Sequence, residues 1–142
     1  MDLPPLLVLP DESAYKAHWI QTYVTPGSLR TFDGIDVRFF EMNFVHAFFT
    51  EVDRGSGKKD KFDRVRAERM DWISVVLSHG TVELYRRLMP DRKLRRIALV
   101  SSESYAVIIQ VERNVSRAQF VTAYTVNSAG VLAKIRSNLT WC

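Results

Sequence analysis

The sequence has one cysteine among its 142 residues, and that cysteine is the last residue, Cys142. An internal disulfide is therefore excluded, as is a zinc site made of several thiolates. The three histidines show no His-Glu-x-x-His or similar ligand spacing, so a metal site has little support. Only six glycines are present, and they form no phosphate-binding loop motif. We therefore expect neither a metal nor a cofactor.

Long hydrophobic runs are also missing. No apolar stretch approaches the roughly 18 residues needed to span a bilayer, so we expect no membrane partner. The first ten residues are mostly apolar, but they carry the acid Asp2 near their start and are interrupted by prolines, which is unlike a secretory signal. A cytoplasmic location is the resulting expectation. Hydrophobic residues at 46% and charged residues at 25% are ordinary for a globular protein, and 142 residues fit one domain.

Positive charge is concentrated in two segments, although the net charge of the chain is only +4. Residues 1–53 carry a net charge of −5, whereas residues 54–69 carry +4 and residues 86–96 carry +5. Such basic segments attract polyanions by releasing counterions, with an affinity that depends strongly on salt. Charged runs are also common on solvated surfaces, so by itself the pattern is only modest support for a nucleic-acid-binding function.

The N-terminal third predicts a helix followed by strands. Asp11 is typical of a residue that caps a helix, and this helix should stop before Pro26. Asp33–Gly34 predicts a turn. Alternation then favours a strand over residues 35–39, and a second extended run over residues 44–51 is rich in aromatics.

The rest of the chain predicts a basic loop over residues 54–60, a helix, and two hairpins. The helix over residues 62–77 should end near His79–Gly80, because glycine accepts the left-handed cap conformation. Residues 81–89 have no clear class. The hairpins pair residues 97–101 with 105–112, and 120–126 with 131–136. Because strand and helix do not alternate, the pattern favours an α+β fold with an antiparallel sheet covered on one face by helices.

Arg69 occupies an apolar stripe of the predicted helix. The stripe consists of residues at three- and four-residue spacing, namely Phe62, Val65, Arg69, Trp72, Ile73 and Val76. Burying an unpaired guanidinium costs several kcal/mol, so Arg69 should pair with a carboxylate or face an anion in a cleft, which Arg66 could share. The alternative is a side chain whose stem packs while its head reaches water.

The predicted strands carry three polar residues of interest. In residues 120–126, Thr122 and Tyr124 share one face with Phe120, so two hydroxyls project from the sheet. In residues 44–51, His46 shares a face with aromatic side chains. These residues suit a half-open binding face, but a histidine in the interior is more often structural, and a threonine or tyrosine often lies at the rim of a core.

Three short segments carry a resemblance to a known family. They are Phe44-Val45-His46-Ala47-Phe48, Arg66-Ala67-Glu68-Arg69-Met70-Asp71-Trp72-Ile73 and Phe120-Val121-Thr122-Ala123-Tyr124. In this order they resemble the phage-borne branch of the barnase, EndoU, colicin and RelE-like ribonucleases, over roughly residues 30–136. The resemblance implies a barnase- or RelE-like α+β fold, in which N-terminal helices pack on a curved antiparallel sheet of about four strands. We expect a single domain over 1–142, in which 31–142 form the nuclease-like core and 1–30, outside the resemblance, form an N-terminal helical extension.

The same resemblance implies a metal-independent endoribonuclease, phage- or toxin-associated, in which the ribose 2′-hydroxyl attacks the adjacent phosphorus. His46 is then the general acid or base, Arg66 and Arg69 stabilise the phosphorane, and Thr122 and Tyr124 orient the phosphate. The substrate-binding residues are Lys58, Lys61 and Arg64. The expected partners are RNA, with tRNA as a candidate, and an immunity or antitoxin protein.

Two other functional classes fit the same residues. The basic segments and the strand face suit a nucleic-acid-binding or partner-binding module that does not catalyse a reaction. A phage accessory protein whose aromatic face docks on a partner chain is the weaker alternative. Binding without turnover would favour the first class, and co-assembly that is insensitive to salt would favour the second.

Overall fold

The computed structural model describes residues 1–52 and 59–141. An extended N-terminal segment leads into α1 (Glu12–Trp19), which begins where predicted because the side chain of Asp11 accepts a hydrogen bond from the Ala14 amide at 2.9 Å. The last turns widen into the π-helix η1 (Ile20–Val24), which ends before Pro26 as expected. Gly27 then adopts a left-handed φ of 87°, and the chain enters the sheet.

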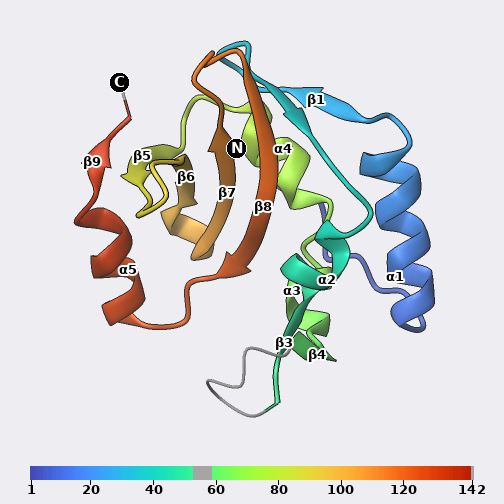
Figure 1. Cartoon of the computed structure of the whole chain (residues 1–142). Helices are drawn as coiled ribbons and strands as arrows, with labels where there is room; N and C mark the ends of the chain where they lie inside the picture. The colour runs from blue at the N-terminus through green and yellow to red at the C-terminus, as the bar shows by residue number, and fades with distance from the viewer. Residues whose placement is uncertain (53–58, 142) are drawn as a thin grey trace.

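The main sheet is mixed and has seven strands in the order β1-β2-β8-β7-β6-β5-β9 (Figure 1). Its strands are β1 (Ser28–Arg30), β2 (Asp36–Arg38), β5 (Glu83–Leu88), β6 (Leu94–Val100), β7 (Tyr105–Val111), β8 (Arg117–Thr125) and β9 (Leu139–Thr140). All neighbours are antiparallel except β2 and β8, which are parallel. A second sheet pairs β3 (Phe49–Glu51) with β4 (Lys59–Phe62).

The prediction of an antiparallel sheet of about four strands covered by N-terminal helices was therefore wrong. The sheet is larger because the three-residue strands β1 and β2 join it beside β8. The three-residue strand β1 has too little alternation to be recognised. β2 lies within the strand predicted over residues 35–39, but its parallel partner β8 lies about eighty residues further along the chain, and no local pattern indicates that pairing. The barnase- or RelE-like architecture, which was part of this prediction, was wrong for the same reason.

Helices cover both faces of the sheet, with α1 and α5 (Ala129–Arg136) on opposite sides (Figure 1). The inner face packs on α1, on α2 (Asn43–Phe48) and on α4 (Trp72–Ser78), and this larger core is aromatic. Trp19 is fully buried there, with its ring centroid 5.3 Å from that of Phe48 and 5.4 Å from that of Phe120. The outer face carries a smaller cluster that includes Ile97 and Ile108 and packs against Ile135 of α5.

The predicted extended run over residues 44–51 was wrong for most of its length. Residues 43–48 form α2, and only Phe49–Glu51 is extended. Phe44, Ala47 and Phe48 are buried at the spacing of one helical face, and this burial outweighs the strand preference of an aromatic-rich segment. Asn43, the first residue of α2, ties the helix to the segment before it, because its Oδ1 accepts from the Phe40 amide at 2.7 Å.

The predicted continuous helix over residues 62–77 was also wrong. Phe62 ends β4, and a short helix α3 (Arg64–Ala67) begins where the Asp63 side chain accepts from the Arg66 amide at 3.2 Å. A turn follows before α4 (Trp72–Ser78), which ends near His79–Gly80 as predicted. Gly80 does not adopt a positive φ, so the expected left-handed cap is not formed. Glycine suits this position for another reason, because a Cβ here would lie 3.0 Å from the Phe32 ring.

The first C-terminal hairpin was predicted correctly, and the second was not. β6 and β7 pair through the turn that contains the 3₁₀ helix η2 (Ser101–Glu103). Residues 131–136 belong to α5 instead of a strand, because the Ser128 hydroxyl caps that helix by accepting from the Val131 amide at 3.1 Å. The unclassified residues 81–89 form β5 over Glu83–Leu88.

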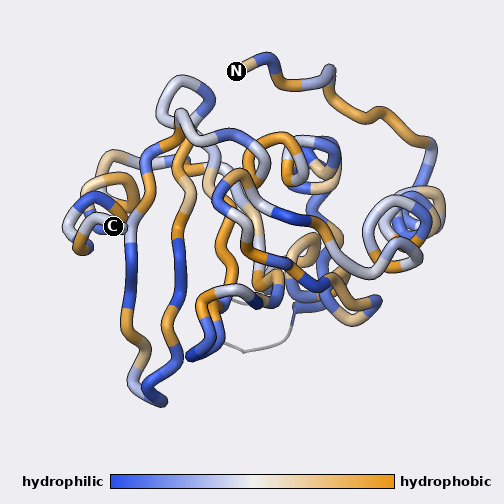
Figure 2. The backbone as a smooth tube through the Cα atoms, turned by 90° about the horizontal axis from the view of Figure 1, so that it is seen from above, coloured by the Kyte–Doolittle hydropathy of each residue, from blue (hydrophilic) through white to orange (hydrophobic). Residues whose placement is uncertain are grey.

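The N-terminal segment runs along the outside of the molecule as an extended stretch (Figure 2), and it contacts α4 and the turn before it. The Trp72 indole donates to the Pro4 carbonyl at 2.7 Å, and the Leu7 amide donates to the Glu68 carbonyl at 2.8 Å. The Tyr15 hydroxyl donates to the Leu7 carbonyl at 2.7 Å. Residues 1–30 therefore contribute to the inner core and to the sheet edge.

Candidate functional site

Five polar side chains form a row across the outer face of the sheet. The register pairs Arg87 with Arg95, Arg95 with Gln110, and Gln110 with Gln119, and β2 adds Arg38 opposite Gln119. Directly paired residues project from the same face, so the row runs over β5, β6, β7, β8 and β2. A sheet face usually buries apolar side chains, so this row is the first indication of a binding surface.

A β-bulge in β8 sets which side chains join this face. Ile108 pairs with Thr122, but Ile109 pairs with Phe120, so Val121 is the extra residue. Phe120 therefore packs in the inner core, whereas Tyr124 packs with the outer cluster. The prediction that Phe120, Thr122 and Tyr124 share one face was wrong for Phe120. The two hydroxyl residues do share the outer face.

Two cavities lie along β8 on the outer face. The glutamine cavity has a volume of about 420 Å³ and is lined by Asn43, His46, Lys59, Arg95, Gln110, Gln119, Phe120, Val121 and Thr122. The tyrosine cavity has a volume of about 400 Å³ and is lined by Arg66, Arg87, Ile97, Ile108, Tyr124, Thr125, Asn127, Val131, Lys134, Ile135 and Asn138. The paired Arg87 and Arg95 lie one in each cavity, so the cavities adjoin, and we refer to them together as the outer groove.

Cations from both basic segments line the outer groove. Lys59 and Arg66 come from the first segment, and Arg87 and Arg95 come from the second. Burial, and then the charge of Arg66, hold the pKa of Lys59 below its ordinary value of 10.5, although Glu51 acts in the opposite direction. No aspartate or glutamate is among the described residues that line either cavity. The electrostatic environment therefore favours an anion.

Arg66 contacts the tyrosine of the groove. Its guanidinium lies 5.7 Å from the centre of the Tyr124 ring, and its Nε lies 3.5 Å from a carboxylate oxygen of Asp63. Burial raises the pKa of Tyr124 above its ordinary value of 10.0, whereas the charges of Arg66 and Arg87 act to lower it. Tyr124 therefore stays protonated at neutral pH and can donate a hydrogen bond.

His46 is an exposed residue of α2, so its predicted position on a strand was wrong. It nevertheless lines the glutamine cavity together with Thr122, and its main-chain carbonyl accepts a hydrogen bond from the Lys59 ammonium at 2.7 Å. The helix and the strand thus bring the imidazole residue, a lysine and a hydroxyl to one cavity.

Arg69 lines neither cavity. It follows α3 in the turn before α4, where its Nη1 donates to the Val65 carbonyl at 2.7 Å. Its guanidinium lies 5.2 Å from the centre of the Trp72 ring. The Arg69 head group therefore contacts a main-chain carbonyl and an aromatic ring. The fully buried arginine of the described chain is Arg96, whose Nη1 donates to Asp33 at 2.7 Å.

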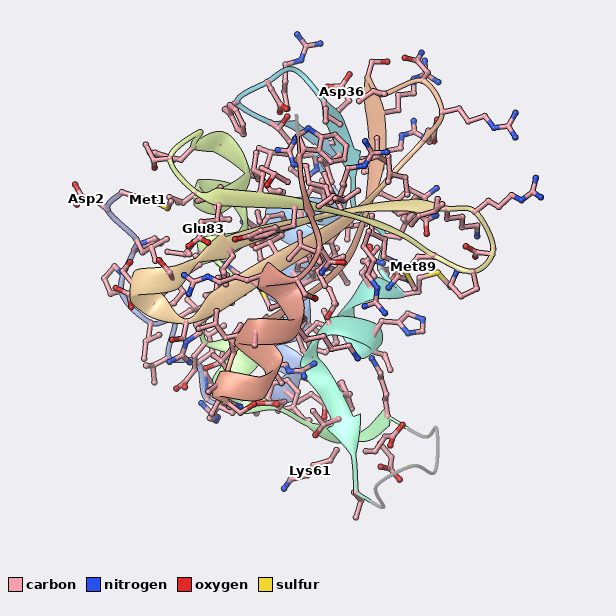
Figure 3. The ribbon with its side chains drawn as sticks, turned by 90° about the vertical axis from the view of Figure 1, so that its left-hand side faces the viewer. Met1, Asp2, Asp36, Lys61, Glu83 and Met89 are labelled. Carbon is pink, nitrogen blue, oxygen red and sulfur yellow. The ribbon has the colours of Figure 1, made fainter. Side chains whose placement is uncertain are left out.

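Two of the three predicted substrate-binding residues, Arg64 and Lys61, line neither cavity. Arg64 holds the N-terminal segment, since its Nη1 donates to the Leu9 carbonyl at 2.8 Å and its Nη2 to the Pro10 carbonyl at 3.2 Å. Lys61 points outward from the β3–β4 hairpin (Figure 3). Lys58 lies outside the described residues.

Sequence reasoning missed Lys59, Arg87, Arg95, Gln110 and Gln119. Alternation along residues 83–88 and 94–100 could have placed Arg87 and Arg95 on one face, had the class of residues 81–89 been recognised. Gln110 and Gln119 gave no signal, because a single glutamine within an apolar strand has no characteristic spacing.

Within residues 1–52 and 59–141, no group of three or more histidine, cysteine, aspartate or glutamate side chains is arranged to bind a metal ion. None of the helices in these ranges is both long and apolar enough to cross a membrane. No protein-family profile matches the chain, and neither curated proteins nor solved structures give a significant match.

Proposed function

We propose that the outer groove binds single-stranded RNA. The observation that carries this proposal is the convergence of two basic segments, distant in sequence, on adjoining cavities without a lining carboxylate. Lys59, Arg66, Arg87 and Arg95 would contact phosphates and release their counterions. The row of arginines and glutamines crosses several β-strands, so it offers a series of polar contacts along the path that one RNA strand would follow.

Hydrogen-bonding groups support RNA as the polyanion. Gln110 and Gln119 supply amides, and Thr122 and Tyr124 supply hydroxyls, to the same groove. Amides and hydroxyls both donate and accept hydrogen bonds, so they can contact a ribose 2′-hydroxyl as well as exposed base edges. A groove lined by cations alone would not offer this recognition.

The test is fluorescence anisotropy of a labelled single-stranded RNA at several salt concentrations, with Arg87→Gln and Arg95→Gln variants. Each variant should weaken binding and reduce the slope of log K against log salt by about 0.7, the value for one phosphate contact to a single strand. Arg86→Gln is the matched control, because Arg86 is exposed on the same strand but projects from the opposite face. Equal effects at positions 86, 87 and 95 would contradict the proposed groove.

RNA cleavage is the second candidate function, favoured by the presence of His46 and Lys59 in the cavity that Thr122 also lines. His46 would take the 2′-hydroxyl proton, the 2′-oxygen would bond to phosphorus, and the bond from phosphorus to the 5′-oxygen would break. Lys59, with its lowered pKa, would protonate the leaving oxygen, and Arg66 would stabilise the phosphorane. The products are a 2′,3′-cyclic phosphate and a 5′-hydroxyl.

Incubation of labelled tRNA with the protein and EDTA tests this second function. Discrete cleavage products should form, and they should disappear with His46→Ala. His79→Ala is the matched control, because His79 is an exposed histidine whose Nδ1 lies 2.8 Å from the Val75 carbonyl, away from the groove. If the RNA stays intact but binds in a salt-sensitive way, the cleavage function is excluded and only the binding function remains.

A further inference from the structure

Two polar atoms at the glutamine cavity have no hydrogen-bond partner. Arg95 Nε and Thr122 Oγ1 are buried, and no described residue bonds to either atom. Leaving a buried donor unsatisfied costs free energy, so native proteins rarely retain such atoms without a reason. Arg96 Nε is also unsatisfied, but the Arg96 guanidinium already pairs with Asp33 at 2.7 Å. Arg95, by contrast, lines a cavity and has no carboxylate partner among the described residues, and Thr122 lines the same cavity.

The two residues approach the cavity from opposite sides of one strand. Arg95 on β6 pairs with Gln110 of β7, and Thr122 on β8 pairs with Ile108, two residues earlier on β7. Residues two apart on a strand share a face, so the guanidinium and the hydroxyl flank the same stretch of β7. Lys59 lines this cavity as well and supplies a second cation.

We propose that Arg95 and Thr122 form a seat for one phosphate group, with Lys59 adding charge. This inference rests on the proposed function, and it identifies one phosphate-binding position within the outer groove. An arginine fork matches two oxygens of a tetrahedral phosphate, and a threonine hydroxyl can donate to a third. Phosphate binding requires rotation about the side-chain torsions of Arg95 and Thr122, which brings their buried donors toward the cavity.

The chemistry of the donors favours a phosphate over a base edge. The charged groups of Arg95 and Lys59 donate hydrogen bonds and accept none, whereas a base edge presents donors as well as acceptors. No aspartate or glutamate is among the described residues that line this cavity, although Glu51 lies opposite Lys59 in the β3–β4 pair. Base recognition would instead depend on the amides of Gln110 and Gln119.

The test is titration of the ¹⁵N-labelled full chain with inorganic phosphate, observing the arginine Nε–Hε signals by NMR at constant ionic strength. One signal, assigned to Arg95 by its loss in Arg95→Lys, should shift and saturate. Thr122→Val should weaken phosphate binding by about tenfold, the effect expected of one hydrogen bond to a charged group. Thr81→Val is the matched control, because Thr81 is an exposed threonine outside the groove.

Three results would overturn the phosphate seat. If RNA binds but phosphate leaves the Arg95 signal unmoved, the seat is wrong and the proposed function stands. If phosphate has no effect and Thr122→Val changes the preference among RNA homopolymers, the cavity recognises bases. If neither RNA nor phosphate binds, both the seat and the proposed function fail.

Discussion

Arg87 and Arg95 lie directly opposite each other on the antiparallel strands β5 and β6. Two like charges at paired positions repel each other and destabilise a sheet. Arg87→Gln should therefore stabilise the protein by a few tenths of a kcal/mol, up to about 1 kcal/mol, while it weakens RNA binding. Urea unfolding measures the change, with the exposed Arg113→Gln as control. A loss of stability would mean that Arg87 has a favourable role in the unbound fold.

Thr122→Val should also stabilise the protein. Valine keeps the branched shape of threonine and removes the unsatisfied Oγ1 from a buried position. The gain should be roughly 1 kcal/mol, at the lower end of the cost of an unsatisfied group. Thermal unfolding monitored by circular dichroism measures it. A decrease in stability would show that the hydroxyl is hydrogen-bonded in solution and would remove one premise of the phosphate seat.

Asp33→Asn should destabilise the protein in a pH-dependent way. Burial tends to raise the pKa of Asp33, but hydrogen bonds from Thr31 and Arg96 outweigh it and hold the pKa below 3.8. The charged carboxylate therefore stabilises the fold above the unfolded pKa, and this stability is lost as pH falls through the folded pKa. Because Asp33 is partly exposed, we expect a loss of roughly 2 kcal/mol at neutral pH, less than for a fully buried pair.

Urea unfolding of the wild type and of Asp33→Asn at neutral pH and at pH values below about 4 tests this dependence. The difference between the two proteins should shrink in acid. Asp91→Asn is the control, because its pair with Lys93 at 3.8 Å is exposed and should contribute little. A difference that stays constant across the pH range would assign the effect to packing instead of charge.

Lys59 should make RNA binding sensitive to alkaline pH. Its pKa is lowered by burial and by Arg66, so it loses its charge at a lower pH than an ordinary lysine. The affinity should therefore begin to fall below the usual lysine range, and Lys59→Arg should remove this early fall. Anisotropy with 2′-O-methyl RNA, which resists alkaline hydrolysis, measures the profile. Lys61→Arg is the matched control, and an identical shift in both variants would exclude Lys59 as the titrating group.

The parts of the fold that were predicted correctly depend on local signals. The Asp11 cap fixes the start of α1, and the β6–β7 hairpin has two long β-favouring strands joined by a short polar turn. α2 was misassigned because its phenylalanines satisfy both a strand composition and a helical spacing. Tertiary burial decides between the two, and composition alone does not contain that information.

The site was predicted only in part, for a related reason. The two basic segments are visible in the sequence, but their convergence depends on the tertiary fold, which brings Arg66 to the cavity of Arg87 and Lys59 to the cavity of Arg95. Whether Arg95 or Arg96 faces the groove depends on strand register, and a shift of one residue would exchange them. His46 and Thr122 line one cavity although the predicted secondary structure of His46 was wrong.

The parallel pairing of β2 with β8 constrains how the chain folds during synthesis. Asp36–Arg38 cannot join the main sheet until residues 117–119 have left the ribosome. Contacts this distant in sequence close late and slow the formation of the native state. The N-terminal third, with Trp19 and its aromatic neighbours, therefore waits with apolar surface exposed while most of the chain is translated. We therefore expect the nascent chain to expose apolar segments of the kind that chaperones bind.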